Sequence, residues 1–79
     1  MYMNKYSRIL GRRIKSQREK QLLSPETVAT KLDVQVSDYL NWESGKAKPQ
    51  ERQLIKLSYI LRSHVSQFKT GLVLDGLQQ

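Results

Sequence analysis

The chain has 79 residues with no cysteine and one histidine, which excludes disulfides, thiolate metal sites and a metal site built from histidines. At this length we expect one small domain, stabilised by apolar packing or by a partner subunit. Fourteen Lys and Arg against seven Asp and Glu give a net charge of +7. This charge favours a protein that binds a polyanion, either nucleic acid or an anionic membrane surface, over a soluble protein that is basic without such a partner.

Insertion into a membrane is not expected, because no apolar run approaches the ~20 residues that span a bilayer and no secretory signal pattern is evident. We therefore expect a soluble, cytoplasmic protein. Apolar residues recur at helical spacing, and period-2 alternation is brief and confined to the tail. The chain is accordingly predicted to be all-α.

The first predicted helix covers residues 6–21. Its apolar stripe is narrow and stops at Ile14, so we interpret it as packing on a core rather than lying on a membrane. A second helix begins at Pro25, because Ser24 is a favourable N-cap and Glu26 complements the helix dipole. This helix is short, and the residues expected on its buried face are Val28, Ala29 and Leu32.

The third predicted helix covers residues 36–44 and ends at Gly45. Asp38 falls in its first turn, where a carboxylate is favourable. A fourth helix over residues 50–61, a fifth over residues 65–70 and a tail over residues 71–79 follow. The apolar residues expected to pack the last two helices are Leu54, Ile55, Leu57, Ile60, Leu61, Val65 and Phe68.

The second and third helices have the features of a helix-turn-helix. Ala29 is small enough to let two short helices cross closely. Asp33 occupies the turn, and aspartate tolerates a positive φ better than most residues. Val34 then extends from the turn into the core.

The run LGRRIKSQREKQLLSPETVATKLDVQVSDYLNWESGKAKP, with LIKLSYILRSHVSQF after it, resembles the Cro/C1-type (phage-repressor-like) helix-turn-helix family. The matching positions are Ile14, Arg18, Ser24, Val28, Ala29, Leu32, Val34, Trp42, Glu43, Gly45, Lys46, Pro49, Leu57 and Leu61. The resemblance implies a compact five-helix lambda-repressor-like domain over residues 6–70, with its helix-turn-helix at about residues 24–44. It also implies a homodimer on operator DNA, with the second helix across the backbone and the third in the major groove.

Four positions depart from the family pattern. Asp33 stands where glycine is usual, and Gln17 and Ser63 stand where apolar residues are usual. Pro25 replaces a common glutamine and removes an amide that could contact a phosphate. None of these changes excludes the fold, and together they indicate a divergent member.

On a helical wheel the third predicted helix is amphipathic, with Tyr39, Trp42 and Glu43 on the inward arc and a polar stripe opposite. Asparagine can pair with adenine, serine can bond to several base edges, and apolar side chains can pack on thymine methyl groups. The candidates for base contacts are Gln35, Val36, Ser37, Leu40 and Asn41, and the resemblance points to all of these except Leu40. For Val36 and Leu40 the alternative is ordinary helix packing.

Most of the affinity for DNA is expected from phosphate contacts. The candidates around the third helix are Ser24, Thr30, Ser44, Lys46, Lys48 and Arg52, whereas Arg8, Arg12, Lys56 and Lys69 are interpreted as solvated surface. Glu43 on the inward arc requires a partner. The resemblance implies an ion pair with Arg18 that joins the first helix to the third and leaves guanidinium N–H groups for a phosphate.

The leading hypothesis is a sequence-specific DNA-binding transcriptional regulator, a small repressor that binds a pseudo-palindromic operator as a homodimer. Its two recognition helices would then lie about 34 Å apart. Dimer contacts are expected from the fifth helix and the tail, through Phe68, Leu72, Val73, Leu74 and Leu77; the alternative is that these residues complete the monomer core.

A rival hypothesis is a helix-turn-helix fold used as a protein-binding module, such as an antitoxin or an adaptor, and a role on a membrane surface ranks third. Regulation by concentration or by a partner protein is expected over response to a small ligand. No nucleophile–base pair, metal cluster or glycine-rich phosphate loop is evident. We therefore expect no enzymatic activity, no metal and no cofactor.

Overall fold

The computed structural model describes residues 5–69, and over that range it consists of five α-helices without a strand. They are α1 (Lys5–Lys20), α2 (Pro25–Leu32), α3 (Val36–Ser44), α4 (Glu51–Ile60) and α5 (Val65–Lys69). The predicted all-α, five-helix fold is confirmed. Each predicted helix end that falls within this range lies within one residue of the observed end.

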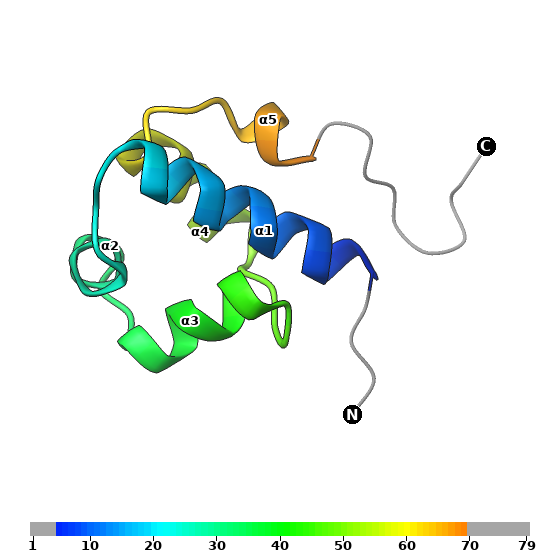
Figure 1. Ribbon diagram of the computed structural model, residues 1–79, viewed down its shortest axis with the longest axis horizontal. Helices are drawn as coiled ribbons and strands as arrows, with labels where there is room; N and C mark the ends of the chain where they lie inside the picture. Colours follow the sequence, from blue (N-terminus) through cyan, green and yellow to red (C-terminus); the bar gives the residue numbers. More distant parts are fainter. Residues whose placement is uncertain (1–4, 70–79) are drawn as a thin grey trace.

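Helix α1 has the central place in the arrangement. Figure 1 shows it running across the molecule with α3 on one side and α5 on the other, and α1 packs against both. Helix α2 contacts α3 and α4, and α4 contacts α5. Helix α3 therefore lies at an edge, with one face against the rest of the domain and the other turned away.

Signals read from the sequence account for the ends of α2 and α3. The Oγ atom of Ser24 accepts a hydrogen bond from the backbone N–H of Thr27 at 3.1 Å and caps α2. Asp33 ends α2 in the left-handed conformation, with φ 61° and ψ 46°, as predicted. Gly45 ends α3 with φ 85°, and the backbone N–H groups of Gly45 and Lys46 donate to carbonyls of the last turn.

One hydrophobic core joins the helices. Its buried members are Leu10, Ile14, Val28, Ala29, Leu32, Tyr39, Trp42, Leu54, Leu57, Leu61 and Phe68. Two expectations are wrong. Ile55 was expected in the core but is 40% exposed, because α4 buries the face that carries Leu54 and Leu57. Phe68 is fully buried, so its side chain completes the monomer core instead of forming the dimer contact expected for it.

Helices α1 and α3 lie in close backbone contact at Gly11. A Cβ atom at this position would lie 2.3 Å from the carbonyl oxygen of Trp42 and 2.7 Å from that of Glu43. These are backbone atoms, so any larger residue would force the two helices apart. This requirement for glycine, which the sequence pattern did not reveal, brings the last turn of α3 directly onto α1.

Two of the departures from the family pattern bond to each other. The Ser63 hydroxyl, in the loop between α4 and α5, donates to Oε1 of Gln17 on α1 at 2.8 Å. Both residues are half-buried. A polar contact thus stands where two apolar residues are usual, and it attaches the α4–α5 loop to α1.

Candidate nucleic-acid interface

Helix α3 has a buried inner face and an exposed outer face. Tyr39 is fully buried and Trp42 is 6% exposed, and their rings meet edge to face with centroids 5.9 Å apart. Ser37, Leu40 and Asn41 on the other side are exposed. The amphipathic orientation predicted from the wheel is therefore confirmed, and the outer face is polar except for Leu40.

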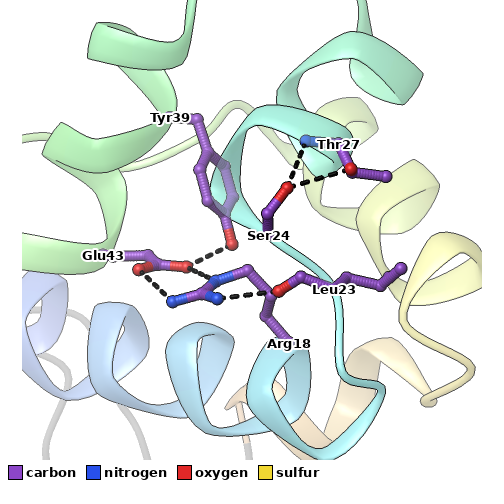
Figure 2. Close-up of polar contacts among 6 residues, drawn as sticks. All are labelled: Arg18, Leu23, Ser24, Thr27, Tyr39 and Glu43. Carbon is purple, nitrogen blue, oxygen red and sulfur yellow. Dashed lines mark hydrogen bonds and ion pairs between the residues drawn. The ribbon is translucent and has the colours of Figure 1, made fainter.

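The predicted ion pair between Arg18 and Glu43 is present. The Nε atom of Arg18 donates to Glu43 Oε2 at 2.6 Å, and Nη2 donates to Oε1 at 3.2 Å, so the guanidinium holds the carboxylate with two bonds. Nη1 donates to the carbonyl oxygen of Leu23 at 2.8 Å. Figure 2 shows that one guanidinium joins α1, the α1–α2 loop and α3.

Tyr39 adds a third donor to this cluster. Its hydroxyl donates to Oε2 of Glu43, which lies one turn further along α3 (Figure 2). The sequence indicated Tyr39 only as a core aromatic, although its spacing of four residues from Glu43 places both side chains on one helix face. Glu43 therefore accepts bonds from two buried side chains, and α3 is fixed in rotation about its axis.

The two donors of the cluster, Arg18 and Tyr39, both have a raised pKa. The hydrogen bond with Glu43 raises the pKa of Arg18, and this effect exceeds the lowering caused by desolvation. Burial raises the pKa of the Tyr39 phenol, and its bond with Glu43 raises that pKa further. Arg18 is charged and Tyr39 is protonated at neutral pH, so both donate and the carboxylate charge is compensated.

The phosphate contact expected for Arg18 is not favoured by its surroundings. The side chain is only 10% exposed, and three of its N–H groups are used by Glu43 and Leu23. Arg18 thus serves mainly to join elements of the domain, and its contact with a phosphate remains a prediction.

The candidates for base contacts lie together at the start and along the outer face of α3. Gln35 precedes the helix and is exposed, and its side chain makes no capping bond. Ser37 and Asn41 are exposed, and Leu40 is 42% exposed. Val36 is half-buried and packs against the core, as in the alternative considered for it. The contacts with bases remain predictions.

The three hydroxyl candidates for phosphate contacts are exposed, but two already donate within the protein. The Ser24 hydroxyl donates to Thr27 Oγ1 at 2.9 Å, and the Ser44 hydroxyl donates to the carbonyl of Asn41 at 3.2 Å. Both would have to rotate to donate to a phosphate. Thr30, on the exposed face of α2, has no side-chain hydrogen bond among the described residues.

The three remaining cationic candidates lie between α3 and the first turn of α4. Lys46 and Lys48 are exposed in the loop, and Arg52 is exposed in α4. Lys48 Nζ lies 5.3 Å from the centroid of the Tyr6 ring, a cation–π contact. The side chains of Lys46 and Arg52 have no hydrogen bond or ion pair with any residue in the range 5–69.

A hollow of about 370 Å³ lies beside the outer face of α3, between this helix, α1 and the α3–α4 loop. It is lined by Lys15, Leu40, Asn41, Glu43, Ser44 and Lys46. Lys15 was not among the predicted site residues. Its position three residues before Arg18 places it on the side of α1 that faces α3, and this spacing is the signal that could have identified it.

Within residues 5–69, no helix is long and apolar enough to cross a bilayer. The same part of the chain has no cluster of three or more side chains that could ligate a metal ion. Four of the residues expected at a dimer interface, Leu72, Val73, Leu74 and Leu77, lie outside the described residues.

Three solved structures of similar fold are available for comparison. The restriction–modification controller protein C.AhdI from Aeromonas hydrophila superposes with a TM-score of 0.71 at 23% identity, over 76% of this chain and 91% of that one. The clp gene regulator ClgR from C. glutamicum gives 0.76 at 16% identity, over 91% and 99%. A transcriptional regulator from Listeria innocua gives 0.70 at 20% identity, over 89% and 64%.

At these identities the likeness establishes the fold. No curated protein matches the chain. The family model described as helix-turn-helix matches residues 14–68, which include the whole of α2, α3 and α4 and the Arg18–Glu43 pair. The family that the sequence resembled is thereby confirmed: the chain belongs to the Cro/C1-type helix-turn-helix family of DNA-binding transcriptional regulators.

Proposed function

We propose that the protein is a sequence-specific repressor that binds a pseudo-palindromic operator as a homodimer, with α3 in the major groove. The recognition helices of the two subunits lie about 34 Å apart, one turn of DNA. Occupancy of an operator that overlaps a promoter represses transcription. Residues 6–70 form the DNA-binding domain, and residues 71–79 contribute to the dimer.

The observation that supports this proposal best is the division of α3 into two faces. Its inner face is fixed by Tyr39, Trp42 and the Arg18–Glu43 pair, whereas Ser37 and Asn41 are exposed on the outer face. A rigid helix that presents an amide and a hydroxyl is suited to reading base edges. The cations that flank this face supply the attraction to the phosphates.

Binding to DNA is tested by titration of labelled duplexes at several salt concentrations. We expect a steep loss of affinity with salt, with a slope of about −0.9 for each phosphate contacted. Asn41→Ala should reduce the preference for a selected duplex over a random one, at a cost of about 1–3 kcal/mol in discrimination. Lys46→Ala should weaken binding to both duplexes by the same factor.

A protein-binding module is the second candidate. It is favoured by Leu40, which is 42% exposed in the middle of the outer face of α3, and by the absence of arginine from α3. The same titration separates the two functions. No binding to any duplex at about 100 mM salt would contradict the proposed repressor and favour the module.

The dimer is supported by an apolar surface next to α5. Tyr59 is 77% exposed and Ile55 is 40% exposed, and with Val65 they line a hollow of about 600 Å³ between α4 and α5. A second copy would cover these side chains. Sedimentation of Tyr59→Glu and of a chain ending at residue 70 should each show a shift toward monomer; an unchanged dimer in both would exclude this surface and the tail.

A further inference from the structure

The hollow beside α3 has a composition that points to a specific ligand group. We propose that Lys15 of α1 and Lys46 of the α3–α4 loop hold one backbone phosphate of DNA between them, next to Asn41. The proposal rests on the proposed DNA-binding function and adds α1 to the surface that contacts the nucleic acid. It also assigns a role to Lys15, which belongs to none of the predicted contacts.

Two unpaired cations define the site. Lys15 and Lys46 are exposed, both line the hollow, and neither ammonium group has an ion pair or a hydrogen bond with any residue in the described range. Two ammonium groups that share a concave surface repel each other unless an anion lies between them. The exposed amide of Asn41 on the same wall would reach a base while the two lysines hold the neighbouring phosphate.

The carboxylate of Glu43, which also lines the hollow, does not prevent binding of an anion. Its two oxygens accept bonds from Arg18 and Tyr39, and its side chain is only 6% exposed. The guanidinium compensates its charge within the protein. The exposed charge of the hollow therefore comes from the two lysines.

A purely structural role for the lysines is the alternative to consider. Helix α3 has no basic residue in its last turn, and cations near a helix C-terminus are stabilising. However, the carbonyls of Asn41 and Trp42 already accept bonds from backbone N–H groups after the helix, including that of Lys46, and neither lysine side chain donates to them. Thermal melts without DNA separate the roles, because phosphate binding predicts melts for Lys15→Ala and Lys46→Ala equal to that of the wild type.

The test uses a duplex selected by the full chain from a random pool, together with copies that carry one neutral methylphosphonate linkage at successive positions. Lys15→Ala should weaken binding to the unmodified duplex. Between 50 and 200 mM salt, each phosphate contact contributes a factor of about 3 to 4 to the loss of affinity. If Lys15→Ala loses one contact, its affinity should fall over this range by a factor that is about 3 to 4 times smaller than the factor for the wild type. Lys15→Arg should retain the affinity. Lys20→Ala is the matched control, because Lys20 is exposed on α1 about 140° around the helix from Lys15 and should have no effect.

One neutral linkage should cancel the effects of both Lys15→Ala and Lys46→Ala. If different linkages cancel the effects of the two variants, the shared phosphate site is wrong and the DNA-binding function stands. The same conclusion follows if Lys15→Ala binds DNA as the wild type does while Lys46→Ala binds it more weakly. If Lys15→Ala lowers the melting temperature of the protein without DNA, the role of Lys15 is structural and the proposal is overturned. If the wild-type chain binds no duplex, the proposed function fails and this site with it.

Discussion

Removal of the Glu43 carboxylate should destabilise the domain strongly. The carboxylate is 6% exposed and accepts bonds from Arg18 at 2.6 and 3.2 Å and from the hydroxyl of Tyr39. Glu43→Ala leaves a guanidinium that is 10% exposed without its counter-charge. Loss of one partner of a buried pair costs about 3–5 kcal/mol. Domains of 79 residues have a free energy of unfolding of about 4–12 kcal/mol, so the loss is a quarter of it or more.

Thermal and urea unfolding of the wild type and Glu43→Ala measure this effect. A loss of 3 kcal/mol should lower the melting temperature by about 12 °C or more, since 1 kcal/mol corresponds to about 4–8 °C in domains of this size. The matched control is Glu19→Ala, which removes an exposed carboxylate of α1. It should change the free energy of unfolding by less than about 0.5 kcal/mol.

A second variant distinguishes the ion pair from general damage to the core. Arg18→Met combined with Glu43→Leu removes both charges and should recover part of the lost stability, because buried pairs exchange for apolar residues at little cost. A residual deficit of about 1–3 kcal/mol is expected, because the carbonyl of Leu23 loses its donor and the buried hydroxyl of Tyr39 loses its acceptor. An unchanged melt for Glu43→Ala would refute the reasoning, as would a double variant less stable than Glu43→Ala.

Three further outcomes are expected. Gly11→Ala should destabilise the domain by at least about 2 kcal/mol in thermal melts, because the new Cβ would lie 2.3 Å from a backbone oxygen of α3. This loss should outweigh the better helix propensity of alanine. A gain in stability would show that α1 and α3 can separate freely. Folding raises the pKa of Tyr39, so the stability that its phenol contributes is present below pH 10 and is lost as the pH rises above it. Above pH 10 the free energy of unfolding should therefore fall less steeply in Tyr39→Phe than in the wild type, by about 1.4 kcal/mol per pH unit. Parallel pH profiles of the two proteins would contradict this. A double-mutant cycle of Gln17→Ala and Ser63→Ala should give a coupling energy of about 0.5–1.5 kcal/mol, whereas additive losses would mean that their bond contributes nothing.

Local signals in the sequence determined the helices and their ends. Ser24 with Pro25 starts α2, Asp33 ends it at positive φ, and Gly45 ends α3, and each of these was predictable because capping and turn chemistry depend on a few neighbouring residues. The two faces of α3 followed from helical periodicity alone. The Arg18–Glu43 pair was predictable from the family pattern, since a charge on the inward face requires a partner.

Most other contacts between residues distant in sequence were decided only by the tertiary structure. Gly11 meets the backbone of α3 and Gln17 meets Ser63, and no periodicity identifies which helices approach at which residue. The same reason explains why Lys15 was overlooked: it lies on the helix before the helix-turn-helix and reaches the candidate site only because α1 and α3 pack closely. The sequence therefore specified the recognition helix, whereas the packing of α1 on α3 decided which cations and buried side chains surround it.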